Sequence, residues 1–376
     1  MPSNVLELTQ ALVAMPSPSS ASNAEISDYL AGYLRRHGFD VERLAYDDNG
    51  VEKVSIVARI GPNGDGEHSG LGLFSHSDTV PGNPGEWAPY TPTVADGRLI
   101  GRGSCDMKGP LAATVVAAAA VDARRLRRPL FVVITADEEV GYGGAYQVAR
   151  ESTLLQGQWP TYGVVAEPTS LVPVYAHKGG ARIYVTARGH AAHTSTDQGV
   201  SANFLIAPFL AEMAALATLF RHDPRFQNAE FDPPTNGFNM VIDDGGCKAN
   251  VTAAKTVATV SFRTMPNDHR DEAMRLILGA AHKYGLETQE HTFGPFYTAP
   301  DSTLIKLALH VTGIAKAKTV PFGTEALVYQ EYIPEQVILG PGSIAQAHTI
   351  GEWIDLAQLE SAVGVYTRLI ERLCGG

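Results

Sequence analysis

Histidine and carboxylate side chains follow short apolar runs of this sequence, in positions where a metal ion could be bound. His76 and Asp78 come after one run, Glu138 and Glu139 after a second, and Glu167 after a third. An aspartate at the start of an alanine-rich segment and a histidine late in the chain extend the pattern. Histidine and carboxylate ligands without thiolate suit zinc, cobalt or manganese.

The two remaining candidates are Asp106 and His348. With them the chain has enough ligands to bind two metal ions, provided that one carboxylate bridges the two ions. Two ions about 3.5–4 Å apart form a clamp for hydrolysis, because they activate water and polarise a carbonyl. A carboxylate that binds no metal must then carry the proton from the water to the leaving amine. Adjacent glutamates, such as Glu138 and Glu139, can divide these two tasks.

Each motif taken singly also has an ordinary structural explanation. A histidine close to an aspartate is usually a hydrogen-bonded pair, and an Asp-Glu-Glu run is usually a solvated loop. The glycines that begin at Gly101 lack the Gly-Lys-Ser/Thr ending of a phosphate-binding loop. The metal hypothesis therefore depends on convergence, since the carboxyl ends of strands in an open α/β sheet form the edge where ligands bind.

The elements that must position these residues predict an α/β fold, with a mostly parallel sheet covered by helices. Short continuous apolar runs indicate buried strands, and apolar residues at three- and four-residue spacing indicate helices. Strands are expected at Val54–Ile60, Leu71–Phe74, Leu130–Thr135, Gly163–Ala166 and Gln336–Leu339. Helices are expected at Asn4–Ala14, Asn23–His37, Met107–Val121, from Ser302, near Thr324–Tyr332 and at Ile354–Leu373.

A change of pattern near residue 180 predicts an inserted α+β domain. Its elements follow the order strand, helix, strand, strand, helix, strand, which is typical of ferredoxin-like domains. We expect a metal-binding catalytic domain at 1–179 and 293–376, and the inserted domain at 180–292. The inserted elements are Ala181–Ala187, Ser201–Phe220, Gly237–Ile242, Lys255–Phe262, Asp268–Lys283 and Leu286–His291.

Composition limits the partners that the protein is expected to bind and the compartment in which it is expected. The 376 residues carry a net charge of −11, which disfavours binding to nucleic acid or to an anionic membrane. The three cysteines, Cys105, Cys247 and Cys374, are too widely spaced for a disulfide framework or a zinc knuckle. Because no basic residue precedes Arg35 and no apolar run is long enough to span a bilayer, we expect a cytoplasmic protein.

Taken together, the motifs resemble the dinuclear-zinc exopeptidases and deacylases. That family includes acetylornithine deacetylases, succinyl-diaminopimelate desuccinylases, aminoacylases and glutamate carboxypeptidases. The matching stretches lie in family order along the whole chain. They are His76-Ser77-Asp78, Gly101-Arg102-Gly103-Ser104-Cys105-Asp106-Met107-Lys108-Gly109, Asp137-Glu138-Glu139, Glu167-Pro168-Thr169, and Gly340-Pro341-Gly342 through Ala347-His348.

The resemblance implies a role for each metal-ligand candidate. His76 and Glu167 would bind one zinc ion, and Glu139 and His348 would bind the other. Asp106 would bridge the two ions. Cobalt or manganese could replace zinc, because geometry and availability decide which metal is used.

The resemblance also implies the groups that act around the metals. Glu138 would be the general acid and base. Asp78 would hydrogen-bond His76 and fix its tautomer. A cis peptide is expected directly after the bridging aspartate, between Asp106 and Met107.

In this family the inserted domain is a lid that also forms a homodimer. His193 would reach the partner's active site and stabilise the tetrahedral oxyanion. Asn250 and Arg263 match lid positions that bind the substrate carboxylate, and Thr324 matches a substrate-binding loop. Glu325 could attract a cationic substrate side chain or could be a structural loop residue.

The expected function is a metal-dependent amidohydrolase that removes an acyl group, in particular acetyl, from an N-acyl amino acid. The tail, at 323–326 and 339–348, is most similar to the acetylornithine deacetylases. The alternatives are a dipeptidase, a carboxypeptidase or a desuccinylase with the same metals. A non-catalytic metal-dependent scaffold is disfavoured, because the free Glu138 is kept beside all five ligand candidates.

Overall fold

The computed structural model describes residues 4–63, 66, 68–266 and 269–375, and the chain divides into two compact units. The larger unit comprises 1–175, 298–318 and 324–376, and the smaller unit comprises 176–297 and 319–323.

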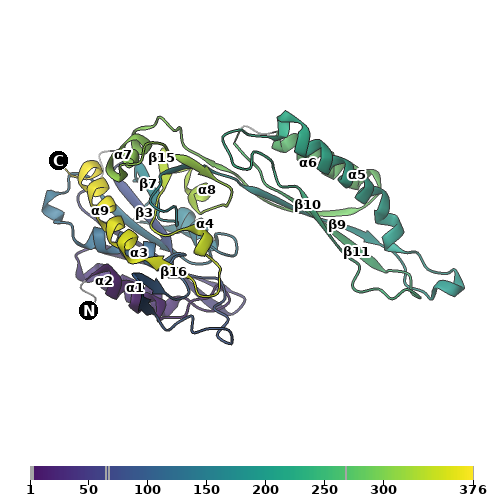
Figure 1. Ribbon diagram of the computed structural model, residues 1–376, viewed down its shortest axis with the longest axis horizontal. Helices are drawn as coiled ribbons and strands as arrows, with labels where there is room; N and C mark the ends of the chain where they lie inside the picture. Colours follow the sequence, from purple (N-terminus) through teal and green to yellow (C-terminus); the bar gives the residue numbers. More distant parts are fainter. Residues whose placement is uncertain (1–3, 64–65, 67, 267–268, 376) are drawn as a thin grey trace. The chain divides into compact units, whose positions relative to one another are not determined.

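Four parallel strands form the centre of the sheet in the larger unit (Figure 1). They are ordered β6 (Leu130–Thr135), β3 (Leu71–His76), β7 (Tyr162–Val165) and β15 (Glu335–Ile338). Almost every residue of these strands is buried, as their continuous apolar runs predict. The expected parallel core is therefore confirmed.

The strand expected at Val54–Ile60 is present as β2 (Val51–Ile60), but it is antiparallel to both neighbours. It forms a hairpin with β1 (Asp40–Asp48), a strand that the apolar pattern did not predict because its residues are mostly exposed. The turn is Asn49-Gly50, with positive φ at both residues, as a tight hairpin requires. Placing this strand in the parallel core was wrong, and Asn-Gly was the signal for the hairpin.

Helices pack on the central strands of the larger unit. Helix α3 (Lys108–Ala119) is apolar all round and almost entirely buried; it packs on β3 and β6 and contacts α1 (Val5–Val13) and α9 (Leu356–Leu373). Helix α4 (Gly143–Glu151), which was not expected, packs on β2 and β6. The other helices are α2 (Ala24–Arg36), α7 (Thr303–Thr312) and the short α8 (Ala326–Tyr329).

Several short strands complete the architecture. A three-stranded sheet is made of β4 (Thr93–Ala95), β5 (Arg98–Ile100) and β16 (Trp353–Asp355). Strand β8 (Val174–His177) follows β7 in the chain, and its first residue pairs with Ile338 of β15. The remaining strands are β13 (Phe296–Tyr297) and β14 (Lys318–Val320).

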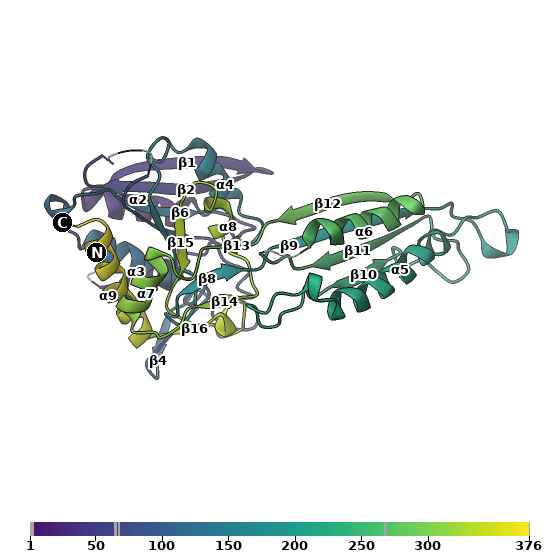
Figure 2. The same ribbon diagram turned by 90° about the horizontal axis from the view of Figure 1, so that it is seen from above.

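The smaller unit has the ferredoxin-like order expected for the inserted domain (Figure 2). Its antiparallel sheet is ordered β10-β11-β9-β12, and its two helices pack against one another and share a core with the sheet. The start of the second helix was expected at Asp268, which lies outside the described residues. The elements are β9 (Gly180–Arg188), α5 (Ala202–His222), β10 (Asn239–Asp243), β11 (Lys255–Phe262), α6 (Arg270–Lys283) and β12 (Glu287–Phe293).

Helix α5 is, by length and apolar composition, long enough to cross a membrane. Its buried residues fall on one stripe, including Ile206, Phe209, Met213 and Phe220, and this stripe packs into the core shared with the sheet. An apolar stripe at helical spacing is typical of a core helix of a globular domain.

Candidate metal centre

The candidate ligands of the larger unit gather at the carboxyl ends of the parallel strands. His76 is the last residue of β3. Asp137–Glu139 (the acidic loop) begins two residues after β6, and Glu167 lies two residues after β7. Asp106 lies two residues before α3. This edge is where open α/β sheets bind ligands, so the topology brings together residues that are far apart in the sequence.

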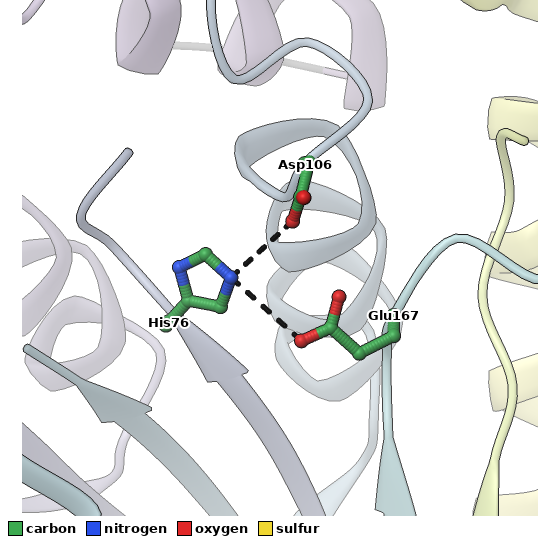
Figure 3. Close-up of side chains that lie close together, drawn as sticks. All are labelled: His76, Asp106 and Glu167. Atoms are coloured by element: carbon green, nitrogen blue, oxygen red, sulfur yellow. Dashed lines mark ion pairs between the residues drawn. The ribbon is translucent and has the colours of Figure 1, made fainter. Parts of the chain in front are cut away.

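The first ligand group is His76, Asp106 and Glu167, whose side chains point toward one another (Figure 3). His76 Nε2 lies 3.4 Å from Asp106 Oδ1 and 3.7 Å from Glu167 Oε1. All three atoms are buried and have no hydrogen-bond partner. Because buried polar atoms are normally satisfied, three convergent orphan atoms of these types fit a bound divalent cation.

The second ligand group is Asp106, Glu139 and His348, and it shares the aspartate with the first. His348 Nε2 lies 3.3 Å from Asp106 Oδ2 and 3.0 Å from Glu139 Oε2. Asp106 therefore presents one oxygen to each group, as a bridging carboxylate must. His348 itself has a left-handed backbone, with φ of 61°, and comes from the loop that follows β15.

The carboxylates of the site are crowded and buried, and their pKa values show it. Burial is the main cause that raises the pKa of Glu167 well above its ordinary value, and the charge of Asp106 adds to it. Hydrogen bonds to Asp106 and Glu139 raise the pKa of His348 to about 10. Without a cation these crowded groups tend to hold protons, which a divalent ion would displace on binding.

Glu138 belongs to neither ligand group. Its Oε2 lies 3.9 Å from His76 Nε2, and its side chain is only 10% exposed. Burial raises the pKa of this carboxyl well above its ordinary value, although the His76 charge opposes the shift. A buried carboxyl group beside the two ligand groups is placed to act as general base and general acid.

Asp78 holds the site in two ways. His76 Nδ1 lies 3.0 Å from the Asp78 carbonyl oxygen, which only accepts hydrogen bonds, so the proton is on Nδ1 and Nε2 is free to bind a metal. The Asp78 carboxylate lies 3.4 Å from the same Nδ1. It also accepts the backbone N–H groups of Glu138 and Glu139, at 3.1 and 3.3 Å.

Glu352 is a supporting residue that the sequence analysis missed. It is fully buried, and its Oε1 accepts the backbone N–H groups of Cys105 and Asp106, both at 2.9 Å. Its Oε2 accepts from Arg102 Nη1 at 2.6 Å and from the Gly103 N–H. Glu352 thus fixes the loop that carries the shared aspartate. A lone glutamate far away in the sequence gave no motif to detect.

The peptide between Asp106 and Met107 is cis, as the family resemblance implied. Glu325 is fully buried and accepts a hydrogen bond of 2.7 Å from Thr135 Oγ1. Its other oxygen, Oε1, is buried without a hydrogen-bond partner. Thr324, next to it, is buried too, and its hydroxyl accepts the N–H of Ala326.

The other expected substrate residues belong to the smaller unit. His193 is exposed, and its Nδ1 accepts from the Ser195 N–H at 3.2 Å and contacts the Ser195 hydroxyl at 2.7 Å. A backbone N–H only donates, so the neutral imidazole of His193 carries its proton on Nε2. Asn250 and Arg263 are exposed, and their backbones pair with Thr194 and Asn236.

A hydrolase that uses metal ions is the class that this fold and this arrangement of ligands define. Comparison with known proteins agrees: the sequence pattern described as Peptidase family M20/M25/M40 matches residues 72–372. The chain belongs to this peptidase family, and it is a metallo-amidohydrolase.

Individual relatives support this assignment along the whole length. An acetylornithine deacetylase from Myxococcus xanthus is 35% identical, over 97% of this chain and 96% of the relative. One from Yersinia pseudotuberculosis is 34% identical, over 98% and 97%.

Solved structures share the fold. The aminopeptidase PepT from Bacillus cereus has a TM-score of 0.73 at 21% identity and covers 98% of both chains. A metallo-carboxypeptidase of the M20 family from Sulfolobus solfataricus has a TM-score of 0.73 at 17% identity and covers 99% of both. A Bacillus subtilis protein, described as a dinuclear metal binding peptidase, has a TM-score of 0.65 at 16% identity, over 98% of this chain and 97% of that one.

Proposed function

We propose that this enzyme removes the acetyl group from an N-acetylated amino acid, with N-acetylornithine as the candidate substrate. The observation that carries the proposal is that Glu138 lies beside two ligand groups that share Asp106 but belongs to neither group. The relatives named acetylornithine deacetylase support the choice of substrate. This activity would place the protein in arginine biosynthesis, in the cytoplasm.

The residues present fit two divalent ions, with zinc first and cobalt or manganese as alternatives. His76 and Glu167 would hold one ion. Glu139 and His348 would hold the other, and Asp106 would bridge them. When bound, the ions supply polarisation of the acyl carbonyl and a lowered pKa for water.

Glu138 carries the proton transfers. Its carboxylate takes a proton from the attacking water, so that a C–O bond forms at the acyl carbon. It then gives the proton to the amide nitrogen as the C–N bond breaks. The products are acetate and a free amino acid. Asp78 assists by holding the backbone of the acidic loop and the tautomer of His76.

We further propose that the inserted domain, taken as 180–292, is the lid and the dimerisation domain. His193 would donate from Nε2 to the oxyanion in the partner's site, which agrees with the tautomer set by Ser195. Exposed apolar side chains on α5 and on the edge strand β10 support a homodimer; they include Phe204, 83% exposed, with Leu205, Val241 and Ile242.

For substrate binding, Arg263 and Asn250 would hold the carboxylate, because a guanidinium fork binds both oxygens. Thr324 would belong to the substrate-binding loop. Arg263 is exposed, and its side chain has no hydrogen-bond or ion-pair partner within the residues that the structure describes. This leaves the guanidinium available for a carboxylate.

A second candidate is hydrolysis of a peptide bond by the same site. It is favoured by the fold shared with an aminopeptidase and a metallo-carboxypeptidase. A succinyl-amino-acid substrate is a variant of the first candidate with a larger acyl group.

A substrate panel tests these proposals. The purified enzyme is assayed on N-acetylornithine, N-succinyl amino acids and simple dipeptides, with metal content measured on the same sample. We expect the highest kcat/KM on N-acetylornithine with two ions bound per chain. Preference for dipeptides would replace the proposal with the second candidate. Full activity in a metal-free sample would overturn both.

A further inference from the structure

The hairpin of β1 and β2 carries a pair of side chains that hold the acidic loop. Tyr46 and Lys53 are direct cross-strand partners in this hairpin. The Tyr46 hydroxyl donates to Asp137 Oδ2 at 2.6 Å, and Lys53 Nζ donates to Asp137 Oδ1 at 2.7 Å. Each oxygen of Asp137 is thus bound by one member of the pair. Lys53 and Asp137 are both buried, so solvent does not weaken their ion pair.

Lys53 is also linked to Asp78, the residue that holds the backbone of the same loop. Its Nζ donates to the Ser19 carbonyl oxygen at 2.5 Å, and the Ser19 hydroxyl donates to Asp78 Oδ2 at 2.7 Å. The Asp78 carboxylate in turn accepts the backbone N–H groups of the two glutamates that follow Asp137. The Lys53 ammonium group therefore binds the Asp137 side chain directly and is linked through Ser19 to Asp78, which holds the backbone of the loop.

The backbone of the loop needs such anchors. Asp137 has a left-handed backbone, with φ of 56°, which turns the chain sharply after β6. The next two residues then face Asp78, and the Asp137 carbonyl accepts the N–H of Tyr142 at 2.9 Å. The position of the Glu138 carboxylate depends on this turn, because Glu138 is the next residue in the chain.

The ion pair has a second consequence. An unpaired Asp137 would add one more carboxylate directly beside the metal ligands. Lys53 pairs with the Asp137 carboxylate, while the next two residues of the loop, Glu138 and Glu139, approach the ligand histidines. Both effects act on the same loop and on the same carboxylates.

We propose that Tyr46 and Lys53 are positioning residues that set the location of the Glu138 carboxylate. Both residues lie on the β1–β2 hairpin, outside the ligand-bearing strands. They act on the position of Glu138 through Asp137 and Asp78. This inference rests on the proposed role of Glu138 in proton transfer.

Tyr46→Phe is the first test, because it removes one hydrogen bond and keeps the ring. We expect kcat to fall about fivefold, since a hydrogen bond to a charged group is lost and the loop shifts. KM and metal content should stay close to wild type, and amide hydrogen exchange of residues 137–139 should become faster. Tyr146→Phe, on an exposed tyrosine of α4, is the matched control and should change none of these. Unchanged kcat in Tyr46→Phe would overturn the inference.

Lys53→Met should lower kcat more, on the order of 10–100-fold, and Lys53→Arg should recover part of the loss. If Lys53→Met does not fold, Tyr46→Phe still decides. The sharpest test combines Tyr46→Phe with Glu138→Gln. If Tyr46 acts through Glu138, adding Tyr46→Phe should alter the residual rate of the Glu138→Gln enzyme by less than about twofold. An undiminished fivefold loss in that background would show that Tyr46 acts elsewhere.

The two proposals fail in different ways. Wild-type turnover in Glu138→Gln would overturn the proposed function, and the inference with it. An inactive Glu138→Gln enzyme together with a fully active Tyr46→Phe enzyme would overturn the inference alone.

Discussion

His76 and His348 approach opposite oxygens of one carboxylate. His76 Nε2 lies 3.4 Å from Asp106 Oδ1, and His348 Nε2 lies 3.3 Å from Asp106 Oδ2. The two histidines are 272 positions apart in the chain, yet the sheet edge and the loop after β15 bring them to the same aspartate. Asp106 is therefore the residue on which a two-ion site depends most.

Asp106→Asn should reduce the metal content below one ion per chain, because both ligand groups lose their shared carboxylate. His348→Ala should keep the buried group of His76 and Glu167 and so retain about one ion. Elemental analysis after dialysis at fixed free zinc measures both. Asp301→Asn, on an exposed aspartate before α7, is the control and should bind as wild type. Equal metal content in Asp106→Asn and wild type would rule out the bridge.

Glu138→Gln should retain both ions and lose turnover. The amide has nearly the shape of the carboxylate but cannot accept the proton from water, so kcat should fall by at least about 10²–10⁴-fold. Steady-state kinetics and elemental analysis on one sample separate the two effects. Glu331→Gln, on an exposed glutamate after α8, should leave both unchanged. A Glu138→Gln enzyme that is slow because it lost metal would move Glu138 into the ligand set.

The parts of the fold that the sequence predicted share one property: their local pattern agrees with their final environment. The continuous run Leu130–Thr135 is buried on both sides as β6, and its bounds are those expected. Strand β11 (Lys255–Phe262) was also expected at its observed bounds, and its burial alternates along the strand. In such segments period and burial alone determine the element.

Other parts could not be predicted, because long-range partners decide them. Strand β1 is a separate case: its mostly exposed residues gave no apolar pattern, and the local Asn49-Gly50 turn to β2 was the only signal for it. The ligand motifs pointed to the two groups because His76, Glu139 and Glu167 lie at or just after the ends of buried strands. The supporting residues Glu352, Lys53 and Tyr46 belong to no short motif, and their contacts with Asp106, Arg102 and Asp137 reach across 84 to 250 positions of the chain. Such contacts appear only in three dimensions.

Glu352→Ala should destabilise the protein strongly. Arg102 Nη1 would lose its buried partner, and three backbone N–H groups would lose their acceptor. Removing one member of a buried ion pair costs about 3–5 kcal/mol of unfolding free energy. Urea denaturation measures the loss. Glu287→Ala removes the partner of Arg188 in a solvent-exposed pair and should cost far less stability. Equal effects of the two variants would contradict the role of Glu352 as a buried anchor.

Glu325→Gln should change how stability depends on pH. Burial raises the pKa of Glu325 from 4.5 to about 7. As the pH rises from 4.5 to 7, the carboxyl ionises in the unfolded chain but stays protonated in the fold. The unfolded state then binds fewer protons, so wild-type stability falls through this window and the loss is complete above pH 7. The loss is on the order of 3 kcal/mol, and the glutamine variant, which cannot ionise, escapes it.

The measurement is the difference in unfolding free energy between Glu325→Gln and wild type, from urea titrations at pH 5 to 8 in the presence of a chelator. The variant should gain on wild type as the pH rises, because the buried carboxylate is the only group that differs between the two chains. Thr135, which donates to Glu325 Oε2, can also donate to the amide oxygen, so the hydrogen bond is kept. Parallel curves over the whole range would show that Glu325 ionises equally easily in the folded and unfolded chains, and its burial would then carry no electrostatic cost.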